Sequence, residues 1–342
     1  MAINLKGRSL DSLLNFKTEE VKYLLDLSID LKKSKQQGLQ TANRPFTGKN
    51  IAIMFQKDST RTRCAFETAG ADLGAGVTYI GPQGSNFGKK ESIEDTAKVL
   101  GRFYDGIEFR GFAQSDIDAL VKYSGVPVWN GLTDEEHPTQ IIADFMTMKE
   151  ELGDLRNKKV VFIGDIKNNM GHSMLIGAAF TGMHITLCGP KSYHSEVRKS
   201  VIDECEKLFK RNGGSLTFSD DKMKAAEGAD VIYTDVWVSL GEPFELFDTR
   251  IGELHDFQVD MKMINKAKEN VIFLHCLPAF HDDHTEFSKD IASKFGKKYP
   301  LVKNGAMEVT DEVFQSKYNK AFDQAENRMH SIKAIMLSTI GY

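Results

Sequence analysis

The chain has 342 residues, of which 41% are hydrophobic and 27% are charged, and its formal net charge is −4. This length predicts two domains rather than one core, and the slightly acidic balance argues against a general nucleic-acid binder. No stretch is apolar for long enough to span a bilayer, and the N-terminal residues lack the apolar core of a signal peptide. The four cysteines form no Cys-x-x-Cys pair, so we expect a cytoplasmic protein without disulfides.

The first half of the chain alternates apolar strands with amphipathic helices. Residues 8–38 predict helices, with Ser9 or Asp11 as the first cap. Helices are expected between the strands that follow, one of them beginning with a capping-box-like pattern at Ser92, and a long helix is expected over residues 138–152. The strands predicted in this half are 50–55, 76–81, 105–112 and 126–131.

A second strand-and-helix series follows a break at residues 153–159. Its predicted strands are 159–165, 184–190, 229–235 and 270–276, and the last helix is expected at 325–340. Such alternation is typical of parallel sheets with right-handed crossovers. We therefore expect an α/β fold of two doubly wound parallel-sheet domains, residues 1–152 and 153–324, with the C-terminal helix (325–342) packing back on the first. In such sheets ligands bind beyond the carboxyl ends of the strands, so we expect the active-site cleft between the domains.

Polar side chains follow the predicted strands in both halves. In the first half they are mostly cations and hydroxyls, namely residues 59–63, Arg110 and His137. In the second half they are carboxylates and a thiol, namely Asp165, Asp235 and the His275–Cys276 pair. This division predicts an anion on one side of the cleft and an amine-bearing molecule on the other.

Arg61 and Arg63 stand in the first turn of a predicted helix, where the helix dipole disfavours positive charge. A helix N-terminus is also a ready anion site, and guanidinium groups match phosphate oxygens. The pattern therefore predicts a phosphate site. The alternative is a capped helix whose arginines are solvated or paired with Glu67, and that alternative suits Arg63 better than Arg61.

Several other motifs are weaker. Gly88-Lys89 lacks the spacing of a P-loop, and the turn after residue 163 lacks the glycines of a dinucleotide site. Cys276, His281 and His284 match no zinc spacing, so we expect no metal. Two readings without catalysis also remain. His137 could serve only as a helix cap, and the loop 234–243 could be an ordinary surface loop in which Trp237 and Leu240 pack.

Six motifs taken together resemble the aspartate/ornithine carbamoyltransferase family, and the resemblance covers nearly the whole chain. They are STRTR (59–63), EFRGF (108–112), HPTQ (137–140), DVWVSLGE (235–242), HCLPAFHD (275–282) and AENRMH (325–330). The resemblance implies transfer of the carbamoyl group of carbamoyl phosphate to the δ-amine of ornithine, giving citrulline and phosphate. It implies no cofactor and no metal. It also implies a homotrimer or a higher assembly of trimers, with no nucleic-acid or membrane partner.

The resemblance also implies a role for each matching residue. Those expected to bind carbamoyl phosphate are Ser59, Thr60, Arg61, Thr62, Asn86, Arg110, His137, Gln140, Cys276, Leu277 and Arg328. Those expected to bind ornithine are Asn169, Asp235, Ser239 and Leu240. Those expected to act in catalysis are Arg110, His137, Asp235 and Cys276, with Cys276 contacting the amino-acid side.

Two positions depart from the family's pattern. Asn86 replaces a glutamine that reaches into the neighbouring subunit's site, and Leu240 replaces a methionine in the specificity loop. Two other functions remain open from the sequence. One is a carbamoyltransferase for putrescine or another amine, and the other is a non-catalytic anion-binding protein of the same fold. The sequence also leaves open whether the reaction runs toward citrulline or, in arginine breakdown, away from it.

Overall fold

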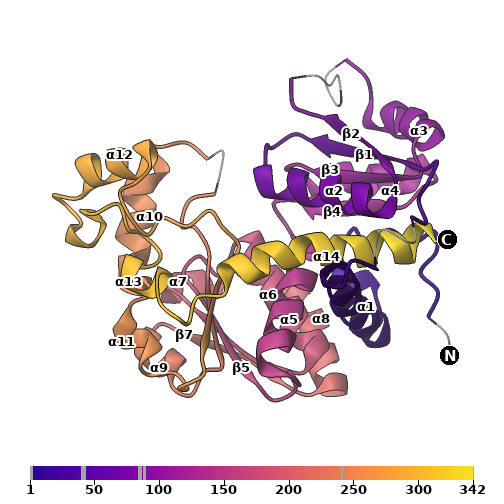
Figure 1. The fold of residues 1–342 in the computed structure, drawn as a ribbon. Coiled ribbons are helices and arrows are strands. Elements are labelled where there is room, and N and C mark those ends of the chain that lie inside the picture. Colours follow the sequence, from indigo (N-terminus) through magenta and orange to yellow (C-terminus); the bar gives the residue numbers. More distant parts are fainter. Residues whose placement is uncertain (1–2, 40–43, 84–86, 88–89, 240–241, 342) are drawn as a thin grey trace. The chain divides into compact units, whose positions relative to one another are not determined.

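The computed structural model describes residues 3–39, 44–83, 87, 90–239 and 242–341, which form two compact units (Figure 1). Unit 1 comprises residues 1–150 and 325–342, and unit 2 comprises residues 151–324. Among the described residues, no helix is both long and apolar enough to cross a membrane.

Unit 1 contains a four-stranded sheet in the order β2-β1-β3-β4, and every neighbouring pair is parallel. Strands β3 and β4 are buried along their length, and apolar residues of β1, β3 and β4 pack with residues of α3 and α4 in a common core. The elements of this unit are η1 (Leu13–Asn15), α1 (Thr18–Gln36), β1 (Asn50–Phe55), α2 (Thr60–Leu73), β2 (Gly76–Ile80), α3 (Ile93–Phe103), β3 (Gly106–Arg110), α4 (Gln114–Ser124), β4 (Val128–Leu132), α5 (Pro138–Leu152) and α14 (Ala321–Ile340).

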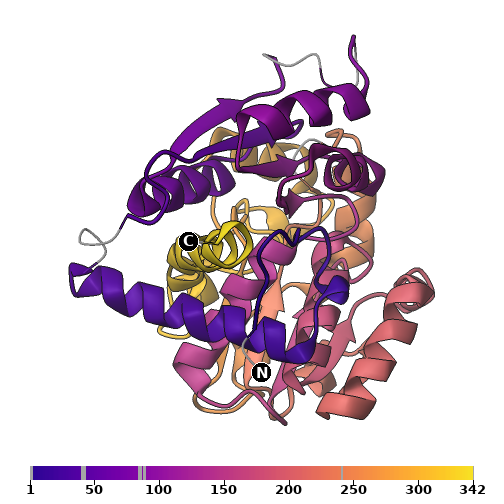
Figure 2. The same ribbon diagram turned by 90° about the vertical axis from the view of Figure 1, so that its right-hand side faces the viewer.

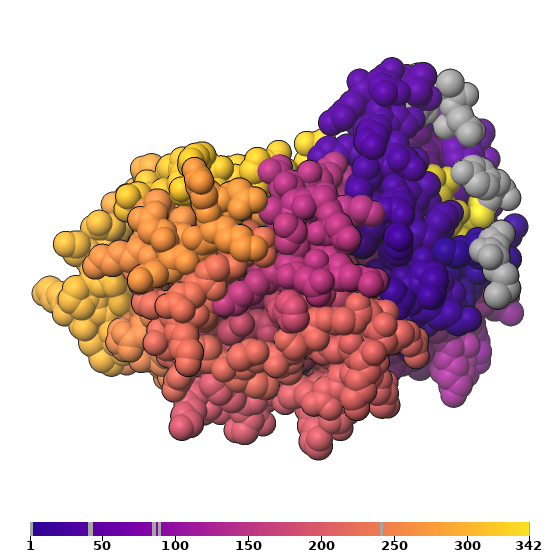
Figure 3. All heavy atoms as spheres, turned by 90° about the horizontal axis from the view of Figure 1, so that it is seen from below, coloured from indigo at the N-terminus to yellow at the C-terminus, as the bar shows by residue number. Residues whose placement is uncertain are grey.

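Residues 325–342 cluster with unit 1 rather than with the residues that precede them. Hydrogen bonds connect α14 with the sheet and with α2. Trp129 Nε1 donates to Thr339 Oγ1 at 2.9 Å, and Lys333 Nζ donates to Asp72 at 2.9 Å. α1 and α14 lie side by side (Figure 2), and Lys32 of α1 donates to α14. In the space-filling view, the indigo N-terminal segments form a continuous part of the surface of unit 1 (Figure 3).

Unit 2 contains a five-stranded parallel sheet in the order β7-β6-β5-β8-β9. Its elements are β5 (Lys159–Ile163), α6 (Asn169–Thr181), β6 (His184–Cys188), α7 (Lys191–His194), α8 (Lys199–Asn212), β7 (Ser215–Ser219), α9 (Lys222–Ala226), β8 (Val231–Thr234), α10 (Leu246–Leu254), η3 (His255–Phe257), α11 (Met261–Ile264), β9 (Ile272–His275), α12 (Glu286–Phe295), η4 (Pro300–Val302) and α13 (Asp311–Phe314). The predicted pair of parallel α/β sheets is therefore confirmed.

Two local predictions are wrong. Strand β7 was not predicted, because it is an edge strand whose residues are only partly buried and form no apolar run. Neither Ser9 nor Asp11 caps the first helical segment, which is the 3-10 turn η1 capped by Ser12. Ser9 instead accepts a hydrogen bond from the backbone N–H of Val128, so it joins the N-terminal segment to the sheet.

Candidate functional site

The site in unit 1 begins where β1 ends and α2 begins. Ser59 is the N-cap of α2, and its hydroxyl accepts the N–H of Thr62 at 3.3 Å. Thr60 is the first helical residue, and the first turn contains no acidic side chain. The strand register pairs Phe55 with Arg110, so this positively charged helix end lies beside the end of β3. The predicted anion-binding features therefore lie together at the carboxyl ends of β1 and β3.

The two arginines of the first turn have different surroundings. Arg63 is exposed, and its Nε donates to Glu67 at 3.0 Å while its guanidinium lies 3.9 Å from the centre of the Tyr79 ring. The predicted pairing of Arg63 with Glu67 is confirmed. Arg61 is half-buried, and its charge helps to lower the pKa of the buried His137. Arg61 therefore belongs to the site electrostatically, and Arg63 belongs to the surface.

A buried hydrogen-bonded chain joins α14 to α2 and α5. Arg328 donates from Nη2 to Thr62 Oγ1 at 3.2 Å and from Nη1 to Gln140 Oε1 at 2.5 Å. Gln140 in turn donates to Asp144 at 2.7 Å. All four side chains are at most 3% exposed. Because buried polar groups that bond one another hold a single geometry, Arg328 and Thr62 are preorganised.

Arg110 and His137 complete this cationic cluster. Arg110 is the last residue of β3, and it donates to the carbonyl oxygens of Lys57 at 3.2 Å and Gly131 at 3.5 Å. His137 immediately precedes α5 and is almost fully buried. Burial, followed by the charges of Arg328, Arg110 and Arg61, lowers the pKa of His137 well below its usual value. A neutral imidazole therefore lies among three guanidinium groups, an arrangement that favours binding of an anion.

Glu108 is a feature of this unit that the sequence analysis missed. It lies in β3, two residues before Arg110, and is fully buried. Neither of its carboxylate oxygens has a side-chain hydrogen-bond partner among the described residues. Burial raises the pKa of Glu108 well above its usual value, although Arg110 and Arg328 lower it in part. An acidic residue inside the otherwise apolar run GIEF was the available signal.

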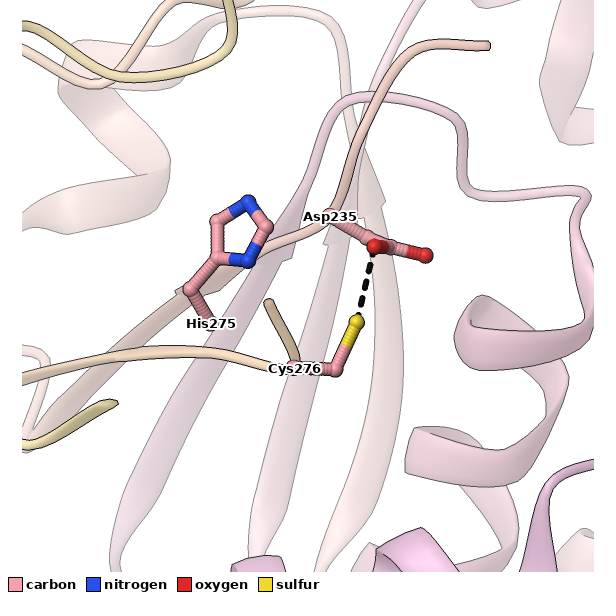
Figure 4. Close-up of side chains that lie close together, drawn as sticks. All are labelled: Asp235, His275 and Cys276. Carbon is pink, nitrogen blue, oxygen red and sulfur yellow. Dashed lines mark hydrogen bonds between the residues drawn. The ribbon is translucent and has the colours of Figure 1, made fainter. Parts of the chain in front are cut away.

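The site in unit 2 forms where β8 and β9 end side by side. The register pairs Thr234 with His275, so the next residues, Asp235 and Cys276, are neighbours. The Cys276 thiol donates to Asp235 Oδ1 at 2.8 Å (Figure 4), and the N–H of Val236 donates to the same oxygen at 2.8 Å. Asp235 is therefore held in one orientation by two donors.

The turn that carries Cys276 is held by a second buried pair. The N–H of Leu277 donates to His275 Nδ1 at 2.9 Å, so the ring's proton lies on Nε2, which donates to Glu308 Oε1 at 3.1 Å. Leu277 has a φ of 57° and is followed by a cis peptide bond to Pro278. Asp235, His275 and Cys276 lie close enough to hold a metal ion, yet both imidazole nitrogens of His275 are already hydrogen-bonded. The arrangement therefore favours an organic substrate over a metal.

The remaining predicted residues of unit 2 lie near these strand ends. Asn169 is the first residue of α6, whose N-cap Asn168 reaches Asp235 Oδ2 at 3.4 Å. Ser239 is partly buried, and its N–H donates to Glu242. Asp165, at the end of β5, has its pKa raised to about 6, mainly by burial and despite Arg250 at 3.5 Å.

Three further sequence predictions concern Trp237 and Leu240 of this unit and Asn86 of unit 1. The predicted packing role of Trp237 is confirmed, because that side chain is 1% exposed. Asn86 and Leu240 lie outside the described residues. The sequence analysis missed Asn168 and Glu308, although the paired asparagines at the start of α6 were a visible capping signal.

Comparison with known proteins places both units in one family. The model of the aspartate/ornithine carbamoyltransferase carbamoyl-P binding domain matches residues 8–150, and the model of the Asp/Orn binding domain matches residues 156–339. The chain is 78% identical to a catabolic ornithine carbamoyltransferase of Malacoplasma penetrans, with all of both chains covered. It is 68% identical to a catabolic ornithine carbamoyltransferase of Mycoplasma pneumoniae, again over all of both chains. The solved ornithine carbamoyltransferase of Pyrococcus furiosus is 36% identical, with a TM-score of 0.88 over 99% of each chain.

Proposed function

Because the chain belongs to the aspartate/ornithine carbamoyltransferase family, we propose that it transfers a carbamoyl group between phosphate and the δ-amine of ornithine. The observation that carries this proposal is the pairing of two chemistries within one chain. Unit 1 has three guanidinium groups around a neutral imidazole, and unit 2 has an oriented carboxylate and thiol. The first set suits carbamoyl phosphate, and the second suits an amino acid.

Carbamoyl phosphate binds in unit 1 in this proposal. Its phosphate accepts hydrogen bonds at the start of α2, where Ser59, Thr60 and Thr62 add hydroxyl groups to the backbone N–H groups of the first turn. Arg61 and Arg328 neutralise its charge. Arg110 and His137 donate to the carbamoyl oxygen, with Gln140 at the carbamoyl nitrogen. Because the pKa of His137 is lowered, its imidazole donates as a neutral group and keeps its proton.

Ornithine binds in unit 2 in this proposal. Asp235 accepts hydrogen bonds from the α-amino group, and Asn169 and Ser239 bind the rest of the amino-acid end, together with Leu240. Cys276 and Leu277 contact the δ-amine and the carbamoyl group. The thiol need not act as a nucleophile, because direct attack by the amine requires no covalent intermediate.

The reaction then requires one bond to form and one to break. The neutral δ-amine attacks the carbamoyl carbon, and the carbonyl oxygen gains negative charge in the tetrahedral intermediate. Loss of phosphate with the C–O bonding electrons and loss of a proton from the nitrogen give citrulline. A preorganised donor to such an oxygen is worth about 2.7–4 kcal/mol. The same residues stabilise the intermediate in reverse, when phosphate attacks the ureido carbon of citrulline.

We further propose that the enzyme works in arginine breakdown, as a cytoplasmic homotrimer. The curated relatives at 78% and 68% identity are both named catabolic, which supports the direction. In the trimer, Asn86 from one subunit would reach the anion site of the next. Mixing Arg61→Ala chains with Asn86→Ala chains would test this, because about one quarter of shared sites in a closed ring would keep both residues. Activity no higher than that of the parents would contradict shared sites.

One parallel assay tests the substrate. Purified protein is given carbamoyl phosphate with ornithine, putrescine or aspartate, and the carbamoylated product is measured. We expect rapid formation of citrulline and at least about 100-fold lower kcat/KM with the other two amines, because neither presents the same amine and amino-acid end together. Phosphate-dependent release of ornithine from citrulline should occur in the same preparation. Turnover of putrescine at the rate of ornithine, or of no amine at all, would contradict the proposal.

A further inference from the structure

A cluster of two imidazoles and two carboxylates lies in unit 2, outside the residues assigned above. His281, Asp282 and His284 belong to the segment between β9 and α12, and Asp311 begins α13. His281 Nδ1 lies 2.8 Å from Asp311 Oδ1 and 3.4 Å from Asp282 Oδ2. His284 Nδ1 lies 2.9 Å from the same Asp282 oxygen. Three donor atoms of metal-binding type, one each from His281, Asp282 and Asp311, therefore lie close together, and His284 adds a fourth beside Asp282.

The separations among these atoms suit a four-coordinate ion. Zinc bonds nitrogen and oxygen at about 2.0–2.2 Å, so the donor atoms of a tetrahedral site lie roughly 3.4 Å apart. The three separations measured here are 2.8, 2.9 and 3.4 Å. One donor atom each from His281, Asp282 and Asp311 lie within 4.8 Å of one another. Small shifts of these three side chains would reach coordination geometry, and His284 would have to move toward His281 and Asp311.

The principal ligands are held by their surroundings. The ring of His281 stacks on Phe314, with centroids 3.8 Å apart and planes inclined by 12°. Gln315 Nε2 donates to Asp311 Oδ1 at 3.2 Å. Burial raises the pKa of Asp311, but hydrogen bonds from His281 and Gln315 outweigh it, and the net pKa is lowered. Outer partners of this kind orient ligands and raise metal affinity.

The cluster is also open to solvent on one side. The Asp311 side chain is 54% exposed and that of His284 is 84% exposed. The orange and yellow segments of unit 2 reach the surface in the space-filling view (Figure 3). An ion can therefore enter without unfolding, and the exposed His284 can rotate to complete the shell.

We propose that His281, Asp282, His284 and Asp311 form a binding site for a divalent transition metal, with Zn²⁺ as the best match. Two imidazole nitrogens and two carboxylate oxygens suit zinc, and Co²⁺ can replace it. The spacing of Cys276, His281 and His284 matches no zinc motif, but the set proposed here omits Cys276 and takes Asp311 from a different element. The ion takes the place of the proton in the hydrogen bond between His281 Nδ1 and Asp311, so metal binding releases protons.

The test is a titration of tag-free, chelator-treated full-length protein with Zn²⁺ by calorimetry and with Co²⁺ by visible absorption. The protein carries Cys276→Ser, so that the Asp235–His275–Cys276 group cannot supply a thiolate. The two test variants in that background are His284→Ala and Asp311→Asn. The matched control is His255→Ala, because His255 forms a similar His–Asp pair, 3.5 Å from Asp256, with a single carboxylate.

We expect one ion per chain, bound through nitrogen and oxygen only. Affinity should fall at least about tenfold in both test variants and stay unchanged in the control. Zn²⁺ should raise the Tm of the Cys276→Ser protein but not that of Asp311→Asn. Absence of stoichiometric binding, or an affinity in His284→Ala and Asp311→Asn equal to that of the Cys276→Ser parent, would overturn the proposal and leave the cluster as a set of surface ion pairs.

Discussion

Replacing Arg61 and Arg63 one at a time by alanine separates the anion site from the surface of the same helix turn. Both arginines stand where the positive end of the α2 dipole disfavours them. Arg63 is compensated by Glu67 and the Tyr79 ring, whereas the charge of Arg61 acts on the buried His137. The same chemical change therefore has different consequences two residues apart.

The expected magnitudes follow from these surroundings. Arg61→Ala removes one preorganised cationic donor from a cluster with a neutral buried imidazole, a loss of about 2.7–4 kcal/mol in transition-state stabilisation, or roughly 10²–10³-fold in kcat/KM. The same change removes an unfavourable charge from the helix start. The free energy of unfolding should therefore stay constant or rise by about 0.3–1 kcal/mol. Arg63→Ala should leave kcat/KM within about threefold of the original protein.

Three measurements check this prediction: initial rates of citrulline formation, calorimetric titration with phosphate, and urea unfolding. Phosphate affinity should fall in Arg61→Ala and persist in Arg63→Ala. The reasoning is refuted if Arg61→Ala keeps most of its kcat/KM, or if both variants lose activity equally. A loss of activity in Arg61→Ala that accompanies a comparable loss of stability would also count against it, because the charge would then support the fold.

Three further changes test other parts of the structure. Asp235→Asn should lower kcat/KM for ornithine at least about 100-fold, because it removes the charge that binds the α-amino group, whereas calorimetry should find phosphate affinity nearly unchanged. Thr339→Val leaves the buried Nε1 of Trp129 without its acceptor, so urea unfolding should show a loss of about 1–3 kcal/mol. The pKa of Asp165 is raised in the folded state to about 6, so its contribution to stability is largest at low pH and is lost as pH rises through that value. The stability of Asp165→Asn relative to the original protein should therefore rise by about 2 kcal/mol between about pH 4.5 and about pH 7.5, and a constant difference would contradict the assignment.

Apolar runs and capping signals were sufficient to locate most of the strands and helices. The run NIAIMF was predicted as strand 50–55 and forms β1 with those bounds, because a central parallel strand must be apolar on both faces. Ser92 was predicted to begin a helix, and its hydroxyl accepts the N–H of Asp95 at the start of α3. Both signals involve residues close together in the chain, so they can be recognised from the sequence alone.

Strand β7, at one edge of the second sheet, could not be predicted from an apolar run. β7 pairs with only one neighbour, and the segment SLTFS is partly exposed along its length. Because its side chains are only partly buried, they need not form an apolar run. Ser9 was predicted as a helix cap, but its hydroxyl accepts a hydrogen bond from the N–H of Val128. Because Val128 lies far away in the sequence, no local pattern reveals this contact.

By itself, the sequence determined which chemical groups follow each strand: hydroxyls and guanidinium groups in the first half, and a carboxylate and a thiol in the second. Parallel strands end at the same edge of a sheet, so that order of residues already implied their grouping. The tertiary structure decided which of those groups pair. Arg328 reached Thr62 and Gln140, Cys276 reached Asp235, and Asp311 reached His281. Such contacts join residues distant in the chain, and they depend on strand register and helix packing, which no local pattern encodes.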